Sequence, residues 1–127
     1  DIAALELADP APEPDPAELQ EDAARAEAAA LAVEGISQTQ SASAGYSARR
    51  IQMAASNGFT AGYARTDRGL SVVAITGTGA GMERDYCGEA RVFQADLPTP
   101  EEIGRRAAER ALLRRAPRQP KASISAT

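Results

Sequence analysis

The apolar positions of the chain follow a helical period near both ends and an alternating period in between. Near the start they recur three or four residues apart, which is the spacing of one face of an α-helix. These positions are Leu19, Ala23, Ala26, Ala30 and Val33. Asp15 suits the N-cap, and Pro16 suits the first helical position. We therefore predict a helix that begins after Asp15, runs to about residue 33 and stops at Gly35.

The middle of the chain, residues 36–93, shows the alternation that is typical of β-strands. Asn57-Gly58 predicts a tight type I′ hairpin turn, because both residues accept positive φ. The apolar phase changes at Arg49-Arg50, which indicates a β-bulge or a bend. Residues 66–69 have the composition of a polar turn. The next run, residues 70–76, is apolar on both faces, which predicts a central strand covered on both sides.

The last predicted strand, residues 82–93, carries its charges on one face, so we expect that face to meet water or a partner. A second helix begins at the capping box Thr99-Pro100-Glu101-Glu102 and ends at Ala116-Pro117. Together these patterns predict an α+β fold. An antiparallel sheet of about four strands packs with two helices, one before and one after the sheet.

A length of 127 residues fits one domain with a single core. We expect this domain to span residues 15–118. Residues 1–14 are rich in Pro and acids and predict an extended tether. Residues 119–127 read as the start of a following element. Because the chain opens at Asp1 and ends without a closing element, we expect it to be a piece of a longer protein.

Charge is distributed unevenly along the chain. Residues 1–27 carry nine acids and one base, whereas residues 101–121 carry seven bases and three acids. The net charge of −4 argues against a general nucleic-acid binder. The sequence has no run of about 20 apolar residues and no secretion leader, so a membrane partner is not expected. A single cysteine favours a reducing compartment, and we expect a cytoplasmic protein.

Few residues of the chain suit catalysis. Histidine is absent, which removes histidine-based nucleophile pairs and the commonest zinc ligand. Cys87 has no activating neighbour in the sequence and reads as an ordinary strand residue. Gly77, Gly79 and Gly81 lack the spacing of a phosphate-binding loop, so they predict a flexible β-connection.

Two groups remain as candidates for contacts. Glu83, Asp85 and Glu89 share a strand face and have the spacing of paired carboxylates, but charged strand faces are mostly edge or interface features. Strict alternation places Arg84 on the other face and leaves Arg91 as the counter-charge. The arginines of the second helix suit a phosphate backbone, but no aromatic residues are interleaved with them. A solvated helix, or one docked on an acidic surface, is therefore the better match.

Several short motifs occur in a fixed order. They are Asn57-Gly58-Phe59, then Met82-Glu83-Arg84-Asp85-Tyr86, then the helix PEEIGRRAAERA at residues 100–111. As a set they resemble the TldD/PmbA metallopeptidase family, most closely its PmbA (TldE) branch. The resemblance covers about residues 17–118 and corresponds to the central region between an N-terminal domain and a larger C-terminal domain. Cys87-Gly88 departs from the aromatic or polar pair that family members tend to carry there.

The resemblance implies a zinc-dependent peptidase assembled from TldD-like and PmbA-like subunits. Such complexes are linked to maturation of microcin-type peptide antibiotics and to degradation of an antitoxin and other unfolded peptides. The zinc motif, H-E-x-x-x-H on a helix, lies on the TldD-like subunit. No residue here matches it, so we expect no catalytic residue and no cofactor in this chain, and zinc on the partner.

The sequence therefore supports a non-catalytic structural and interface domain whose partner is a TldD-like subunit or a second copy. The residues expected to contact the partner or the peptide are Asn57, Gly58, Glu83, Arg84, Asp85 and Tyr86. The alternative is a small module that binds nucleic acid or protein through its basic second helix. An intrinsic hydrolase has no support in the residues.

Overall fold

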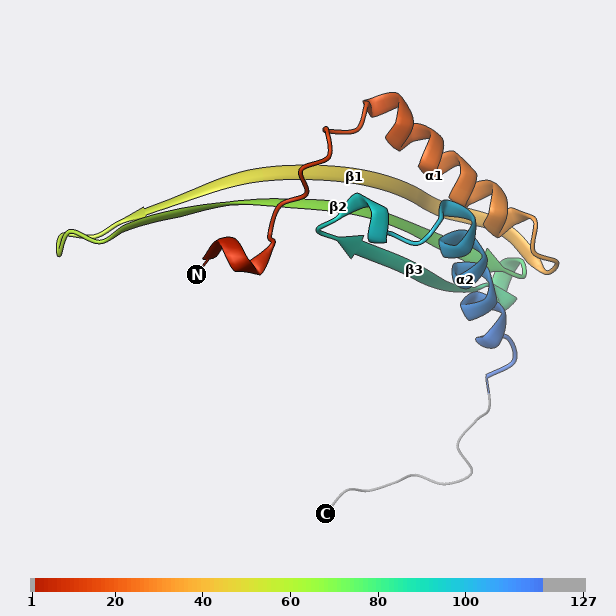
Figure 1. Ribbon diagram of the computed structural model, residues 1–127. Helices are drawn as coiled ribbons and strands as arrows, with labels where there is room; N and C mark the ends of the chain where they lie inside the picture. The colour runs from red at the N-terminus through yellow and green to blue at the C-terminus, as the bar shows by residue number, and fades with distance from the viewer. Residues whose placement is uncertain (1, 118–127) are drawn as a thin grey trace, which may run out of the picture.

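The computed structural model describes residues 2–117 and shows a three-stranded antiparallel sheet with two helices on it (Figure 1). The helices and strands are α1 (Pro16–Leu31), β1 (Ile36–Ala54), β2 (Thr60–Thr76), β3 (Glu83–Arg91) and α2 (Pro100–Leu113). Short 3-10 helices lie between or before them: η1 (Ile2–Leu5), η2 (Gly79–Gly81) and η3 (Gln94–Asp96). The prediction of an α+β fold with one helix before the sheet and one after it is confirmed. The described sheet has three strands, one fewer than the predicted four or so, because β2 runs through the predicted polar turn at residues 66–69. Residues 119–127, the predicted start of another element, lie outside the described residues.

Both helices begin where the sequence predicted. The Asp15 carboxylate accepts a hydrogen bond from the Ala17 amide at 2.7 Å, and the Thr99 hydroxyl accepts one from the Glu102 amide at 3.3 Å. Each cap satisfies an amide that has no partner inside the helix. The helices end earlier than predicted, at Leu31 and Leu113.

The strands differ greatly in length, and this difference divides the domain into a body and an arm (Figure 1). β3 pairs with β2 only from Thr76↔Glu83 to Arg68↔Arg91. β1 and β2 continue pairing well past that point, from Ser47↔Asp67 to Ala54↔Thr60. We call this two-stranded extension, residues 47–67, the arm. It projects away from both helices.

The residues predicted as a polar turn instead lie inside β2, because their polar groups find partners on other elements. The guanidinium of Arg68 is almost buried and donates hydrogen bonds to Glu18 at 2.9 Å, Asp22 at 2.7 Å and Gln94 at 2.7 Å. Burial of a charge is tolerated when it is paired and hydrogen-bonded. Arg68 therefore joins α1 to the sheet.

The N-terminal segment, predicted as a tether, is hydrogen-bonded to the body of the domain. The amide of Thr66 donates to the carbonyl of Leu7 at 3.1 Å, and the amide of Asp9 donates to the Thr66 hydroxyl at 2.7 Å. The Asp9 carboxylate accepts the amide of Gln94 at 2.7 Å, which lowers the pKa of Asp9. These contacts position the segment against the strand at the point where β3 ends.

The predicted bulge at Arg49-Arg50 was wrong. Pairing is regular there, and the register shifts lie between Ile36 and Gln38 and between Thr39 and Ser41. The apolar phase changes for another reason. Near the body, Ala42 and Ala44 pack against the core beneath the helices, whereas in the arm the apolar residues occupy the opposite face of a continuous strand.

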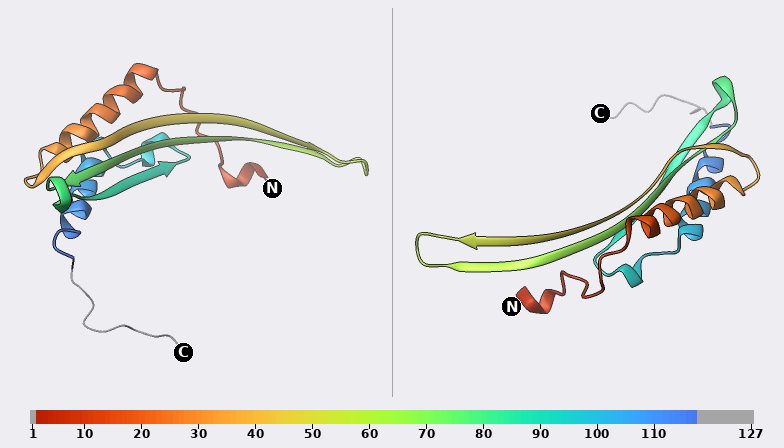
Figure 2. Two further views of the ribbon diagram at one scale, coloured as in Figure 1. Left: turned by 180° about the vertical axis from the view of Figure 1, so that it is seen from behind. Right: turned by 90° about the horizontal axis from the view of Figure 1, so that it is seen from above.

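The core lies between one face of the sheet and the two helices. It consists of Ala26, Ala30, Leu70, Val72, Ala74, Cys87, Ile103, Ala107, Ala108 and Ala111. Both helices lie on the convex side of the curved sheet (Figure 2). β2 is the central strand, as predicted, but it is not covered on both sides, because Ser71 and Val73 on the other face stay partly exposed. No helix or strand among residues 2–117 covers that face.

The two helices touch most closely at Gly104. A Cβ atom at this position would overlap the carbonyl oxygen of Ala26 and crowd Ala29. The absence of a side chain lets α2 approach α1 at backbone distance, so the alanines of both helices reach one narrow core.

We predict that Gly104→Ala lowers the free energy of unfolding by about 2 kcal/mol. The clash of the added methyl group with α1 destabilises the fold by more than the higher helix propensity of Ala stabilises it. Urea unfolding followed by circular dichroism measures the change. Gly45→Ala is the matched control, since a Cβ there would meet nothing within 4 Å. The control should be neutral or stabilising by up to about 1 kcal/mol. Equal stability of the two variants would contradict the close contact between the helices.

Candidate functional site

Asn57 and Gly58, two of the predicted contact residues, lie at the far end of the arm (Figure 1). The amide of Gly58 donates to the carbonyl of Ala55 at 3.0 Å, and the amide of Ala55 donates to the carbonyl of Phe59 at 2.9 Å. Gly58 has φ +87°, whereas Asn57 is not left-handed. The hairpin is confirmed, but its turn has three residues closed by a left-handed glycine and is not the predicted type I′ turn. The Asn57 side chain accepts the amide of Phe59 at 3.1 Å.

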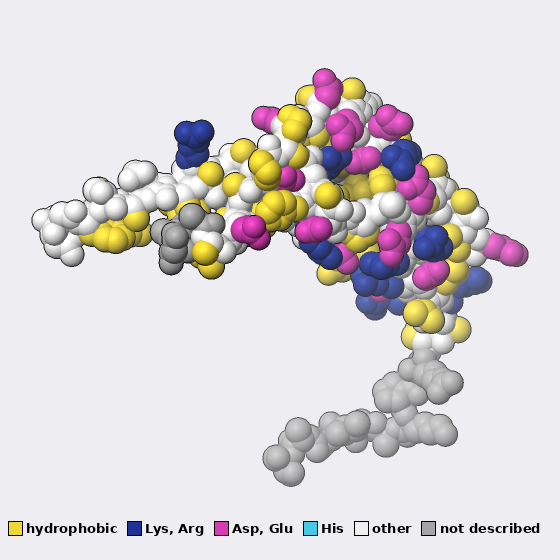
Figure 3. Space-filling model, in the orientation of Figure 1, with side chains coloured by type: hydrophobic (Ala, Val, Ile, Leu, Met, Phe, Trp, Pro, Cys, Tyr) yellow, Lys and Arg dark blue, Asp and Glu magenta, His cyan; other side chains and the backbone are white. Residues whose placement is uncertain are grey.

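One face of the arm carries a group of apolar side chains near this turn. They line a hollow of about 160 Å³, and we call them the arm patch: Ile51, Met53, Phe59, Ala61 and Tyr63. Met53 is 61% exposed, Phe59 50% and Tyr63 39%. Figure 3 shows hydrophobic side chains along the outer arm, whereas charged side chains gather over the helices. Apolar side chains gathered at this exposure are typical of an interaction surface.

Charged residues border the arm patch on the side of the body. The Asp67 carboxylate accepts hydrogen bonds from the guanidinium of Arg65 at 3.2 Å and lies 3.5 Å from that of Arg49. The hydrogen bond from Arg65 holds the pKa of Asp67 below its usual range. Two cations and one anion leave a local charge of +1 beside the patch.

The charged block of β3, residues 83–86, lies at the opposite end of the sheet. Asp85 accepts hydrogen bonds from Arg114, the C-cap residue of α2, at 2.6 Å and from the amide of Tyr86 at 2.8 Å. These bonds, the first above all, lower the pKa of Asp85. Asp85 is thus committed to holding α2 on the sheet.

The structure overturns the expectation that the charged face of this strand meets water or a partner. The same face carries the fully buried Cys87, so it points toward α2. Glu89 pairs with Arg91 at 2.8 Å, as alternation predicted, and lies 3.7 Å from Arg106 of α2. Burial raises the pKa of the Cys87 thiol, which fits an ordinary core residue. Three of the second helix's arginines contact β3, since Arg110 also donates to the Tyr86 carbonyl at 3.0 Å.

The other face of β3 bears the residues that remain available for contact. Tyr86 is 62% exposed and pairs across the sheet with Val73. Arg84 is exposed, and its guanidinium donates to the Gln40 side chain at 2.9 Å. A partner that approached the concave face of the sheet would therefore meet Arg84 and Tyr86 before it met Asp85.

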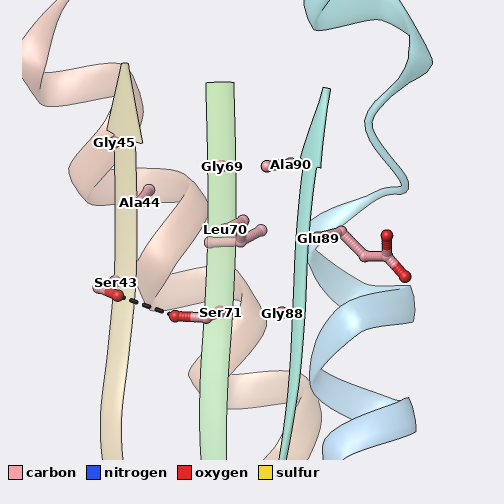
Figure 4. A pocket seen from close by; sticks show the side chains of 9 residues that line it. All are labelled: Ser43, Ala44, Gly45, Gly69, Leu70, Ser71, Gly88, Glu89 and Ala90. Atoms are coloured by element: carbon pink, nitrogen blue, oxygen red, sulfur yellow. Dashed lines mark hydrogen bonds between the residues drawn. The ribbon is translucent and has the colours of Figure 1, made fainter. Parts of the chain in front are cut away.

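A shallow hollow of about 430 Å³ lies on the same face between these residues and the arm. Figure 4 shows small residues from all three strands around it and the hydrogen bond between the Ser43 and Ser71 hydroxyls, whose oxygens are 3.0 Å apart. Glycine occurs in each strand here, at positions 45, 69 and 88. The sequence reasoning missed this hollow, although glycines inside alternating strands are a signal for close approach of another backbone.

The predicted contact residues do not form one site. The arm turn and the β3 block lie at opposite ends of β2, roughly 50 Å apart for an extended strand of this length. No cluster of three or more Cys, Asp or Glu suited to a metal occurs within residues 2–117. Asp85 and Glu89 are already paired with arginines, so the residues present do not fit a zinc site.

Two solved structures share the fold. One is a protein from Thermotoga maritima MSB8 described as a proposed modulator of a DNA gyrase. It has a TM-score of 0.70 and 23% identity over 78% of this chain and 23% of its own length. The other, from Bacteroides thetaiotaomicron VPI-5482 with a similar description, has a TM-score of 0.68 and 25% identity over 84% of this chain and 27% of its own. The chain thus spans about a quarter of the length of these relatives.

The fold and its surfaces define an α+β domain that presents an arm and an open sheet face. The family model of the PmbA/TldA metallopeptidase central domain matches residues 9–115. The chain therefore belongs to the PmbA/TldD metallopeptidase family and is its central domain, which confirms the resemblance seen in the sequence. No curated protein gives a significant match to the chain.

The ion pair of Asp85 with Arg114 makes stability depend on pH. Because the pKa of folded Asp85 lies below its ordinary value of about 3.9, the ionised carboxylate stabilises the fold above that value. The contribution is lost as the pH falls through the lower folded pKa. We predict that Asp85→Asn costs about 0.5–1 kcal/mol at pH 7, and that its deficit shrinks toward pH 3.

Urea unfolding of the unmodified protein and of Asp85→Asn between pH 7 and pH 3 measures this difference in the free energy of unfolding. Glu34→Gln, which changes an exposed carboxylate outside these ion pairs, is the control and should cost nothing at either pH. A deficit for Asp85→Asn that stays constant with pH would show that the charge is not responsible.

Proposed function

We propose that this domain is a non-catalytic structural and interface domain of a PmbA (TldE)-like subunit in a zinc-dependent TldD/TldE-type peptidase complex. The complex would cleave unfolded peptides, including peptide-antibiotic precursors and antitoxins. The observation that carries the proposal is the open concave face of the sheet, where Arg84 and Tyr86 stay exposed, because arginine and tyrosine are among the residue types that dominate interfaces. Membership of the family supports the peptidase context.

The partner in this proposal is a TldD-like subunit or a second copy. Asn57 and Gly58 would reach it from the end of the arm. At the other end of the sheet, Arg84 and Tyr86 would contact the partner or the peptide directly. Glu83 and Asp85 would act through the position of β3, since Asp85 is held by Arg114. Zinc would be bound by the partner, and this chain would supply no ligand to it.

The proposed compartment is the cytoplasm, which suits the one cysteine of the chain because thiols stay reduced there. Within the described residues, no helix has the length and apolar character needed to span a membrane. The alternative module that binds nucleic acid through α2 gains no support, because Arg106 and Arg114 of that helix pair with carboxylates.

Purification of the tagged full-length protein from its own cells tests the proposal. We expect to recover a zinc-bearing TldD-like partner and cleavage of casein or an unfolded peptide, and to lose cleavage when the partner is omitted. Recovery of nucleic acid, or of a monomer without zinc, would contradict the proposal.

The double variant Arg84→Glu/Tyr86→Ala tests the proposed contact on β3. We expect about tenfold less partner in the eluate, because an exposed arginine and tyrosine are the residue types that dominate interfaces. Arg105→Glu makes the same charge change on an exposed residue of α2 and should leave recovery unchanged. Equal recovery with both variants would remove Arg84 and Tyr86 from the interface.

A further inference from the structure

The arm is amphipathic, and its two faces suit different surroundings. One face carries the arm patch with Met53, Phe59 and Tyr63. The opposite face, at alternate positions of the same strands, carries Arg50, Gln52, Ala54, Thr60, Gly62 and Ala64. The second set is small or polar and suits water. The first set suits an apolar surface.

The arm also has little support of its own. From Ser47↔Asp67 to Ala54↔Thr60 it consists of two paired strands, and no element among residues 2–117 buries its patch. A two-stranded hairpin is at best marginally stable in water, and packing on another surface is what makes it stable. The arm therefore needs a cover on its apolar face.

A second copy of the arm is too small to serve as this cover. Met53, Phe59 and Tyr63 together expose roughly 300 Å², taking about 200 Å² for each whole side chain. Two arms face to face would bury roughly 600 Å², about half of what a specific interface between separate chains needs. A surface joined to the arm through the same polypeptide can bind with a smaller buried area, because a linker sets an effective concentration on the order of millimolar.

The longer relatives provide such a tether. The matched part is 23% of one solved chain and 27% of the other, so about three quarters of each lies outside it. The family model describes a central domain, which implies sequence on both sides. The net positive charge beside the arm patch indicates which charge the covering surface has at its edge. Arg49 and Arg65 share the single carboxylate of Asp67, so a further carboxylate complements them.

We propose that the arm patch docks within the same polypeptide, on an uncharged apolar surface of a flanking domain that places a carboxylate opposite Arg49 and Arg65. The arm is then a strut that fixes the central domain relative to its neighbours. This inference rests on the chain's being one domain of a longer polypeptide, and it does not depend on the zinc complex proposed above.

Thiol labelling of Met53→Cys tests the cover, with Gln52→Cys as the matched control on the opposite face of the same strand. We expect the Met53→Cys thiol to react at least about tenfold more slowly in the full-length protein than in the 127-residue chain. The Gln52→Cys thiol should react equally fast in both. Peptide mass spectrometry separates these signals from the buried Cys87. Tyr63→Cys is a second reporter on the patch.

A benzophenone attached to the Met53→Cys thiol distinguishes the source of the cover. A cross-linked product with the mass of one chain, joined to a peptide outside the central domain, supports the proposal. A product with the mass of two chains, or labelling equally fast in both proteins, overturns it. Neither result bears on zinc recovery, so the failure of this inference and the failure of the proposed function are separable.

Discussion

The contact of α1 with α2 at Gly104 is the constraint on which the body of the domain depends. The core contains many alanines, and a methyl group buries little apolar area. A core of such small side chains excludes water only if the helix backbones come very close. Gly104 allows this approach, because a Cβ atom there would overlap the carbonyl oxygen of Ala26. The two helices then fit side by side on one face of the sheet, above Val72 and Cys87.

Charged pairs complete this packing at its edges. Arg68 reaches from β2 to two acids of α1, and Arg114 reaches from α2 to Asp85 of β3. Arg68 and Asp22 are nearly buried, whereas Arg114 is exposed, so salt should weaken the pair of Arg114 with Asp85 more. Both attach the helices to one side of the sheet, and this arrangement leaves the concave side free for other surfaces.

β3 is much shorter than β1 and β2, and this difference in length leaves the arm uncovered. β3 stops at Arg91, and the N-terminal segment with Asp9 occupies the place beside Thr66. Beyond that point β1 and β2 lose their third strand and both helices, so neither a helix nor a third strand among residues 2–117 covers the arm patch. The matched part makes up about a quarter of the length of the solved relatives, so most of each relative lies outside it.

The sequence alone placed both helix starts and the hairpin, but not the helix ends or the type of the hairpin turn. The caps at Asp15 and Thr99, the hairpin at Asn57-Gly58 and the α+β class all depend on neighbouring residues, whose chemistry is visible in the chain. The motif order also indicated the family. Alternation correctly separated Arg84 from Glu83 and Asp85, because side chains in a strand change faces at every residue.

Only the tertiary structure decided which face of each strand is covered. The polar run around Arg68 looked like a turn because its partners, Glu18 and Asp22, lie far away in the sequence. The charged face of β3 looked solvent-exposed because the arginines that neutralise it belong to α2. The arm could not be foreseen for the same reason: a strand pattern records alternation, whereas the lengths of neighbouring strands and the side on which helices pack are set by contacts between distant segments.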